Sequence, residues 1–406
     1  MRLLFLGLNY APEEIGIGLY SGEMLRCWAE EGHEAEVVAA KPYYPQWRVW
    51  PGFGGLWRRS VEHGVRITRC PLYVPAHPTG LCRIVHHVSF AASSLLPMMR
   101  GARKRPDLVM TTAPSLIAAP VALLAAKLCG ARSWLHIQDF EVEAAAATGL
   151  VDGSGLGARM ARGFERWVLQ SFDVVSSISP QMCARLLEKG VRPDRVFQLR
   201  NWADIDGITP LAGQSAYRRE WNITTPHVAL YSGNIANKQG IELVIEAARL
   251  LQSREDLTFV ICGEGPNRAR LEAEAAALPN VRLHDLQPRE RLGELLGMAT
   301  VHLLPQLAGA ADLVLPSKLT NMLASGRPVV ATADPGTGLA DEVDGVGTVT
   351  PPGDAAAFAD AIARLVDDPE SAARLGKAAR ERAEQRWSRN AILRGFMEKS
   401  GEILRL

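Results

Sequence analysis

The chain has 406 residues, more than one hydrophobic core usually organises, so two domains of about 200 residues are expected. Hydrophobic residues make up 47% and charged residues 22% of the chain, which is typical of a well-packed soluble protein. The 45 Lys and Arg nearly balance the 44 Asp and Glu, and this balance argues against a nucleic-acid-binding protein.

The six cysteines are scattered, without a CxxC pair or a Cys/His cluster, so neither a disulfide framework nor a zinc site is predicted. The apolar run at the N-terminus is short and is followed by acids and a proline, which favours a buried strand over a signal peptide. No apolar stretch reaches the ~20 residues that span a bilayer. We therefore expect a cytoplasmic protein with reduced thiols.

Short β-branched runs alternate with helical patterns along the chain, which is the signature of βαβ units and parallel sheets. In the first half, strands are predicted at 2–8, 35–40, 107–111, 132–137, 173–178 and 195–199. The helices predicted between them are 22–31, 115–128 and 157–171.

A loop-like stretch that contains Pro and Gly, residues 201–213, precedes a second series of such units. Here strands are predicted at 227–232, 257–262, 281–283, 301–304, 328–332 and 347–350. Helices are predicted at 241–253, 267–277, 289–298, 320–325 and 355–366.

The pattern predicts an α/β fold with two doubly wound, Rossmann-like domains. We expect residues 1–203 to form the first, 204–384 the second, and 385–406 a C-terminal helix that packs back on the first. Ligands of such sheets bind at the carboxyl ends of the strands, so two sheets that face each other would share one central cleft.

The first candidate ligand loop directly follows the first strand and reads NYAPEEIGIG. Gly16 and Gly18 allow a ligand to approach the backbone, and the N-terminus of the following helix favours an anion. The GxGxxG pattern is incomplete, because Ser21 replaces its third glycine. A tight βα turn explains the loop equally well.

A second strand–loop–helix run, YSGNIANKQG, contains Gly233, Asn234 and Lys238. A lysine and several loop amides at the start of a helix would neutralise a diphosphate as its bond to a sugar breaks. A solvated surface lysine is the alternative.

The third motif, DLVLPSKLTN, gives the strongest signal. Pro316 and Ser317 suit a helix N-terminus, where free amides and a hydroxyl can hold phosphate oxygens. Lys318 adds a positive charge in the first turn, which is unfavourable for the helix itself and so indicates an anion at this place.

Three further strand ends carry candidate residues. Gly263 lies in the turn CGEGP, which packing explains as well as ligand binding does. The loop at Leu286 and Pro288 has backbone groups that could pair with a nucleobase. His136 and Asp139 end a first-domain strand, where the histidine could touch the donor sugar or the acceptor, but a strand-end histidine satisfied by backbone is the alternative.

Together these motifs resemble glycosyltransferase family 4, a family of retaining enzymes with the two-domain GT-B fold. The segments EGHEAEVV, SISPQM, RNWADID and LPSKLTNMLASGRPVVAT extend the resemblance over nearly the whole chain. NYAPEEIGIG and YYPQW are most similar to the branch that contains a colanic acid fucosyltransferase and related exopolysaccharide enzymes.

The resemblance implies an acceptor-binding first domain and a second domain that binds a nucleotide-sugar donor. The nucleotide-sugar is then a substrate, and neither a cofactor nor a metal is expected. The candidate catalytic residues are Lys238, His136 and Asp139. The candidate diphosphate ligands are Gly16, Gly18, Gly233, Asn234, Lys238, Ser317 and Lys318. The candidate nucleoside and ribose contacts are Gly263, Leu286, Pro288 and Asn321.

The chain departs from the family pattern at several of these places. Leu313 and Asn321 replace the two glutamates of Glu-x7-Glu, and Asn234 replaces a common arginine. Gln239 occupies the usual lysine position, with Lys238 one residue earlier. Asn321 can still hydrogen-bond a ribose hydroxyl, though less strongly than a carboxylate. Leu313 offers no such bond, so the cleft carries less charge than is usual in the family.

Residues 43–59 and 83–105 bring aromatic and basic side chains together in the first domain. Such a mixture favours a membrane interface with anionic headgroups, here the inner face of the cytoplasmic membrane. A folded loop that buries its own tryptophans is the alternative. A membrane contact would fit a lipid-linked oligosaccharide acceptor.

The leading hypothesis is therefore hexosyl transfer, with fucosyl from GDP-fucose as one candidate, to a lipid-linked exopolysaccharide precursor. A nucleotide-sugar epimerase of the same fold is the second, although it usually needs cleft carboxylates, which are sparse here. A non-catalytic partner subunit is the third, because Leu313 and Gln239 would fit the loss of turnover. A nucleic-acid partner is not expected.

Overall fold

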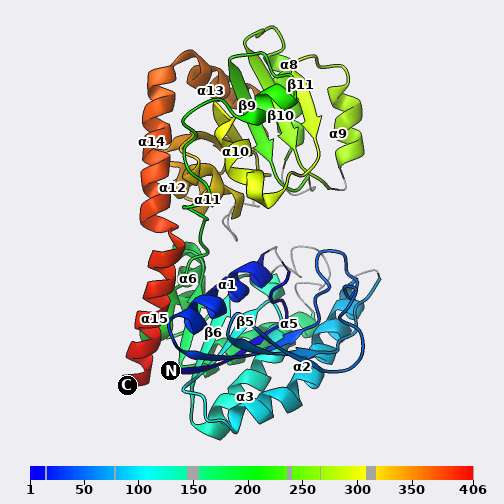
Figure 1. Ribbon diagram of the computed structural model, residues 1–406, viewed down its shortest axis with the longest axis vertical. Helices are drawn as coiled ribbons and strands as arrows, with labels where there is room; N and C mark the ends of the chain where they lie inside the picture. The colour runs from blue at the N-terminus through cyan, green and yellow to red at the C-terminus, as the bar shows by residue number, and fades with distance from the viewer. Residues whose placement is uncertain are drawn as a thin grey trace. The chain divides into compact units, whose positions relative to one another are not determined.

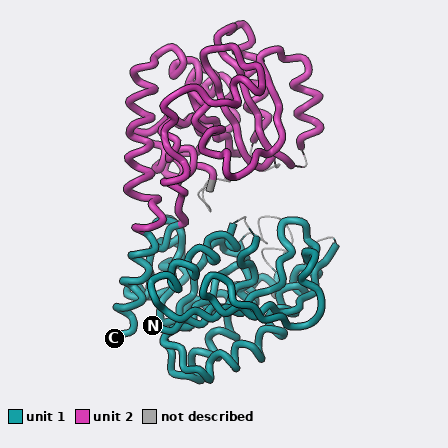
Figure 2. Tube along the Cα trace, in the orientation of Figure 1, with its two compact units in different colours: residues 1–200, 392–406 teal, residues 201–391 magenta. Residues whose placement is uncertain are grey.

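The computed structural model describes residues 1–13, 16–76, 79–143, 155–235, 240–265, 267–307 and 317–405, without the side chains of Leu156 and Ser317. These residues form two compact units, which are coloured separately in Figure 2. Unit 1 comprises residues 1–200 and 392–406, and unit 2 comprises residues 201–391.

Unit 1 is built on an eight-stranded sheet in the order β3-β4-β2-β1-β5-β6-β7-β8. All neighbours pair in parallel except β3 and β4. The central β1 and β5 are almost entirely buried, as expected for strands that are covered on both faces. The strands are β1 (Arg2–Gly7), β2 (Glu34–Ala40), β3 (Arg58–Glu62), β4 (Val65–Cys70), β5 (Leu108–Ala113), β6 (Arg132–Ile137), β7 (Val174–Ser177) and β8 (Val196–Gln198).

Helices cover this sheet (Figure 1). Apolar side chains of α2 and α3 form one core with β1, β2 and β5. The last helix of the chain, α15 (Arg389–Arg405), contributes Phe396, whose ring centre lies 5.5 Å from that of Trp28 and 5.2 Å from that of Trp134. The other helices are α1 (Ile17–Glu30), α2 (Gly80–Ala102), η1 (Leu116–Ala118), α3 (Ala119–Cys129), α5 (Leu156–Ser171), α6 (Pro180–Glu188) and η2 (Pro193–Arg195).

The β3–β4 hairpin is absent from the sequence prediction, which treated Arg58 and Arg59 as part of a loop. They begin β3, an edge strand with mostly exposed, polar side chains, so alternation of apolar residues gave little signal. The local signal lies in the turn. His63 and Gly64 have φ angles of 49° and 78°, the positive values that a two-residue hairpin turn requires.

Unit 2 contains a six-stranded, fully parallel sheet in the order β11-β10-β9-β12-β13-β14. One apolar core lies on each face of this sheet. The strands are β9 (His227–Ser232), β10 (Leu257–Cys262), β11 (Val281–His284), β12 (Val301–Leu304), β13 (Val329–Thr332) and β14 (Gly347–Thr350). The helices are α7 (Ala216–Glu220), α8 (Glu242–Leu250), α9 (Arg268–Ala275), η4 (Arg289–Arg291), α10 (Leu292–Gly297), α11 (Ser317–Ala324), α12 (Gly338–Val343), α13 (Ala355–Asp367) and α14 (Pro369–Arg386).

The strand order reverses between β1 and β5 in unit 1 and between β9 and β12 in unit 2. Ligands of doubly wound sheets bind outside the carboxyl ends of the strands at such a switch point. The NYAPEEIGIG loop follows β1, the YSGNIANKQG loop follows β9, and α11 is the next helix after β12. The fold thus places the described parts of all three motifs at ligand-binding edges, as the α/β prediction requires.

Candidate functional site

Lys318 gives unit 2 a partly buried cation at its switch point. It is the second residue of α11, and its ammonium nitrogen lies 3.0 Å from the hydroxyl oxygen of Tyr231 on β9. The same nitrogen lies 4.4 Å from the centre of the Tyr231 ring. Burial lowers the pKa of Lys318 from 10.5 to about 7. An anion bound nearby would therefore stabilise the charged form.

Tyr231 links this lysine to the loop after β9. Its hydroxyl donates a hydrogen bond to the backbone oxygen of Asn234 at 2.6 Å, so the hydroxyl oxygen is left to accept from Lys318. Burial also raises the pKa of Tyr231, which keeps the phenol neutral. The tyrosine therefore holds the lysine without neutralising it. Tyr231 was not among the residues predicted from the sequence, although it stands directly before the SGN turn.

Gly233 leaves space for the side chain of Lys318. It adopts a φ angle of 132°, which side-chain-bearing residues rarely adopt, and a Cβ at this position would lie 3.2 Å from the Lys318 nitrogen. Asn234 follows as an exposed residue. The glycine is therefore needed both for the turn and for the position of the cation.

Gly263 allows two loops of unit 2 to touch. A Cβ there would lie 1.9 Å from the backbone oxygen of Gly233, closer than atoms can approach. Backbone hydrogen bonds continue past the strand ends, from Gly233 to Cys262 at 2.9 Å and from Ile235 to Glu264 at 2.8 Å. This close contact supports packing as the reason for a glycine at position 263, which was one of the two explanations considered from the sequence. The contact of Gly263 with a nucleoside stays a prediction.

The other predicted nucleoside contacts lie on two elements. Leu286 and Pro288 belong to the loop after β11, where the Leu286 side chain is 61% exposed. Asn321 is half-buried on α11, three residues after Lys318 and so on the same face of the helix. Arg268 fixes the loop after β11, since it donates to the backbone oxygen of His284 at 3.0 Å and pairs with Asp285 at 2.7 Å.

Several predicted residues lie outside the described part of the chain. They are Lys238, Gln239, Leu313 and Pro316, and the side chain of Ser317 belongs with them. Ser317 itself is the first residue of α11, directly before Lys318. The roles expected for Lys238 and Ser317 therefore stay predictions.

In unit 1 the two glycines of the first motif have different surroundings. Gly16 precedes α1 with a φ angle of 60°, and no described atom would lie within 4 Å of a Cβ there. A Cβ at Gly18 would lie 2.7 Å from the backbone oxygen of Glu13. Gly18 is thus required for close packing on Glu13, whereas Gly16 has open space beside it.

Glu13 is a buried carboxylate that sequence analysis missed. One oxygen accepts from the amides of Tyr43 at 2.7 Å and Tyr44 at 2.9 Å, and the other accepts from Asn9 at 2.8 Å. Burial raises the pKa of Glu13, although these donors act in the opposite direction. Glu13 therefore ties the loop after β1 to the loop after β2.

His136 lies on β6 with both ring nitrogens in contact with side chains of unit 1. Nδ1 lies 2.9 Å from the Ser176 hydroxyl, and Nε2 lies 3.2 Å from the Gln138 amide nitrogen. With Gln138 donating, the proton sits on Nδ1. Burial lowers the pKa of His136 to about 3, so the imidazole is neutral near pH 7. The ring nitrogens thus meet side chains, not the backbone groups that the alternative at the sequence level had proposed.

Asp139 follows β6 as a half-buried residue beside a second carboxylate, Glu141. Glu141 accepts from the amides of Ser115 and Leu116, the latter at 2.9 Å. Burial raises its pKa, and the charge of Asp139 acts in the same direction. Ser115 has a φ angle of 119°, a strained value for serine. Glu141, which the sequence motif DFE contains, thus fixes the strained loop after β5.

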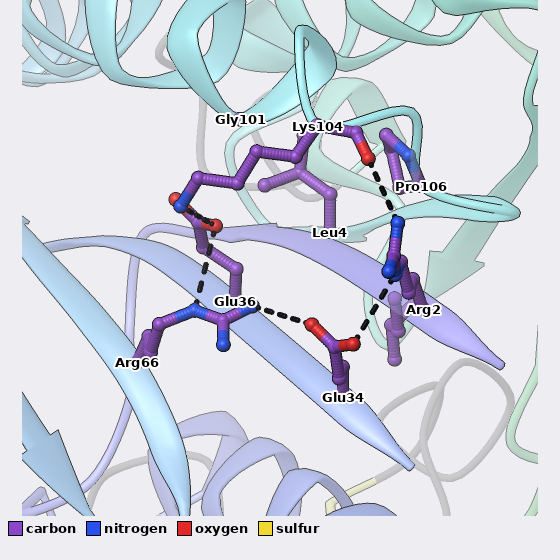
Figure 3. A pocket seen from close by; sticks show the side chains of 9 residues that line it. Arg2, Leu4, Glu34, Glu36, Arg66, Gly101, Lys104 and Pro106 are labelled. Atoms are coloured by element: carbon purple, nitrogen blue, oxygen red, sulfur yellow. Dashed lines mark hydrogen bonds and ion pairs between the residues drawn. The ribbon is translucent and has the colours of Figure 1, made fainter.

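A pocket of about 430 Å³ lies at the opposite, amino-terminal edge of the unit 1 sheet (Figure 3). Its charged lining residues pair with one another, Arg2 with Glu34 at 3.2 Å, Arg66 with Glu34 at 3.1 Å and Lys104 with Glu36 at 2.6 Å. Because doubly wound sheets bind ligands at the carboxyl edge, this pocket is not the candidate site.

Within the described ranges, no three or more His, Cys, Asp or Glu side chains form a group that could hold a metal ion. The same part of the chain has no helix long and apolar enough to cross a membrane.

Comparison with known proteins identifies the family. Residues 16–202 match the model of the glycosyl transferase 4-like domain, and residues 213–382 match that of glycosyl transferases group 1. The chain is 42% identical over 409 aligned residues to WcaI of Escherichia coli K12, which is named as a colanic acid biosynthesis glycosyl transferase. That alignment covers 98% of this chain and 99% of WcaI. The chain belongs to glycosyltransferase family 4.

Solved structures show the same fold for this glycosyltransferase. Sucrose-phosphate synthase from Thermosynechococcus elongatus superposes with a TM-score of 0.75 at 19% identity, with both chains covered completely. HepE from Anabaena, in complex with UDP, superposes with a TM-score of 0.71 at 15% identity, covering 99% of this chain and 100% of HepE. The GT-B fold expected from the resemblance is confirmed.

Proposed function

We propose that this glycosyltransferase transfers a hexosyl group from a nucleotide-sugar to a lipid-linked saccharide during exopolysaccharide assembly, with retention of the anomeric configuration. GDP-fucose is the first donor to test, as the resemblance to the colanic acid branch suggests. The observation that carries the proposal is the full-length similarity to WcaI, whose name places it in colanic acid biosynthesis. The partial similarity to WcaL, 28% identical over 55% of each chain and also named for that pathway, adds support.

Lys318 supplies the chemistry that the proposal needs in unit 2. As the bond between the anomeric carbon and the diphosphate oxygen breaks, negative charge grows on the leaving group. A cation next to that oxygen stabilises this charge, and a partly buried cation does so more strongly than an exposed one. The neutral Tyr231 hydroxyl keeps the ammonium in place, and the N-terminus of α11 adds backbone donors.

In the proposed retaining reaction, the acceptor hydroxyl attacks on the face that the diphosphate leaves. A bond forms between the acceptor oxygen and the anomeric carbon, and the bond from that carbon to the diphosphate breaks. The hydroxyl proton passes to the departing phosphate oxygen, so no protein nucleophile is required. His136 has little capacity to take this proton, because burial lowers its pKa to about 3.

The first test is thermal stabilisation by GDP, UDP, ADP and their sugar conjugates. A ligand that binds only the folded state increases the free energy of unfolding, by about 2.7 kcal/mol when its concentration is 100 times its Kd. The melting temperature rises as a result. Stabilisation by one nucleoside diphosphate, followed by transfer from its sugar conjugate, supports the proposal. The absence of stabilisation by every nucleotide would refute a donor site in unit 2. Retention is read separately, from the anomeric configuration of the product.

A further inference from the structure

Helix α2 has two apolar faces, of which the sheet of unit 1 covers one. The covered face contains His86, Phe90, Ser94 and Met98 at helical spacing. The other face also consists of apolar side chains at helical spacing, and these are between 42 and 75% exposed. They are Leu81, Ile84, Val85, Val88, Leu95 and Leu96, named here the α2 face.

An ordinary surface helix presents polar residues to water on the face away from its core. The α2 face departs from this rule over about 15 residues, or ~23 Å of helix. No Asp or Glu occurs between Thr79 and Arg105. A continuous exposed apolar surface of this kind marks an interaction site.

Two aromatic residues lie beside α2, along one flank of the α2 face. The Trp57 indole nitrogen donates to the backbone oxygen of Ser93 at 2.9 Å, which holds the ring against the second half of the helix. The Tyr73 amide donates to the Ser89 hydroxyl at 2.8 Å, which holds it beside the first half. Both aromatic residues are 46% exposed. Tryptophan and tyrosine are enriched where a protein meets the interface of a membrane.

The positive charge next to the α2 face comes from the arginines at the end of the helix. Arg66 and Lys104 nearby are paired with Glu34 and Glu36, and Arg69 is buried. Exposed Arg100, Arg103 and Arg105 lie at the C-terminal end of α2 or just after it. Basic residues next to exposed apolar ones match a bilayer with anionic headgroups, because the apolar groups insert while the cations meet phosphates.

We propose that the α2 face, with Trp57 and Tyr73, docks this enzyme on the surface of an anionic phospholipid bilayer. The helix lies in the interface, since it is packed on the sheet of unit 1 and the arginines at its C-terminal end stay with the headgroups. This inference goes beyond the transfer reaction and gives the lipid-linked acceptor of the proposed function a physical route to the enzyme. It narrows the membrane contact expected from residues 43–59 and 83–105 to one helix face.

The test is sedimentation of the full chain with vesicles of phosphatidylcholine, with and without phosphatidylglycerol. We expect binding to the anionic vesicles, weaker binding to the neutral ones, and a decrease with salt. A Val88→Glu, Leu95→Glu variant should lose at least about tenfold in binding. An Arg100→Gln, Arg103→Gln variant should lose about fivefold for each charge removed.

The matched control is Leu187→Glu, Leu250→Glu, which makes the same change at two exposed leucines of α6 and α8. It should bind vesicles within about twofold of the original protein. Circular dichroism and the nucleotide-induced thermal shift verify that each variant is folded. Equal binding by the original protein and the Val88→Glu, Leu95→Glu variant would overturn the proposal, as would the absence of binding to anionic vesicles.

Two further outcomes distinguish membrane docking from self-association of the chain and from the transfer reaction. A concentration-dependent dimer that the Val88→Glu, Leu95→Glu variant abolishes would assign the α2 face to a second copy of the chain and overturn the membrane proposal. Transfer to a soluble acceptor without vesicle binding would leave the proposed function standing and refute the docking. Vesicle binding without recognition of any nucleotide would do the reverse.

Discussion

The carboxyl edges of the two sheets hold their charges in opposite ways. In unit 1, buried carboxylates accept hydrogen bonds from loop amides, as Glu13 does from Tyr43 and Tyr44. In unit 2, a lysine is held against a neutral tyrosine. The first arrangement uses its charge in fixing loops, whereas the second places a partly buried lysine at the switch point of unit 2. We therefore expect unit 2 to bind the anionic substrate, and the carboxylates of unit 1 to keep the loops of that unit ordered.

The largest expected effect comes from removing the cation of unit 2. Lys318→Ala should lower kcat by about 100-fold to 1,000-fold, as the loss of one donor to a developing negative charge typically does. It should not lower the melting temperature strongly, because the charged lysine loses part of its hydration on folding and so adds little net stability. Lys377→Ala, on the exposed surface of α14, is the matched control. Activity of Lys318→Ala within a few-fold of the original would contradict the assignment of Lys318.

The second effect tests the loop-fixing role in unit 1. Glu13→Ala leaves the amides of Tyr43 and Tyr44 without their acceptor, so we expect a loss of about 3 kcal/mol in the free energy of unfolding. Urea titration measures it, with Glu30→Ala on the exposed side of α1 as the control. Nucleotide affinity of the folded variant should be unchanged. A large loss of nucleotide affinity without loss of stability would mean that unit 1 also holds the anion.

The third effect is a pH dependence confined to unit 2. Because the pKa of Lys318 is about 7 in the free protein, an anion that binds the charged form should bind more weakly above that pH, by up to about tenfold per pH unit, with proton uptake. Calorimetry with a nucleotide-sugar measures both quantities, since its diphosphate does not titrate in this range. Lys318→Arg keeps its charge and should remove the dependence. A dependence that survives this change would have another origin.

The same titration has a consequence for stability. The pKa of Lys318 is about 7 in the folded chain and 10.5 as its ordinary value, so between these values the unfolded chain binds more protons. The free energy of unfolding should therefore rise with pH through this window. Urea titrations of the original protein and of Lys318→Met, compared across the window, isolate the contribution of this lysine.

The smallest expected effect concerns His136 in unit 1. His136→Asn removes the hydrogen bond to Ser176 and should cost about 1 kcal/mol of stability. Because the pKa of His136 is about 3, the pH profile of kcat above pH 5 should keep its shape. Steady-state kinetics across pH measures it. A shift of the profile in the variant would instead assign to His136 the catalytic role that its sequence position suggested.

Most of the fold could be predicted from the sequence because buried parallel strands are short, apolar and flanked by turns. The predicted limits of β6, β9, β10, β12 and β14 agree with the structure to the residue. The omitted strand β3 has a weaker pattern. It is an exposed edge strand, so it lacks the simple periodicity of a half-buried element.

The candidate site was predictable in its loops but not in its contacts. Motif glycines and Lys318 stood out because residue type and position after a strand are visible in the sequence. Glu13, Glu141 and Tyr231 did not, since their roles arise from partners on other elements, such as Tyr43 for Glu13. Hydrogen bonds between loops depend on which strands are neighbours in the sheet, and the spacing of residues along the chain does not predict that order.

The sequence by itself determined the α/β class, the family and the anion-suited helix start at Lys318, because periodicity and motif spacing are local properties. Only the tertiary structure decided that Lys318 contacts Tyr231, that Gly263 packs against the backbone of Gly233, and that one apolar face of α2 stays exposed. The reason is that burial sets the pKa of a lysine, the function of a glycine and the exposure of a leucine, and burial depends on elements far apart in the chain.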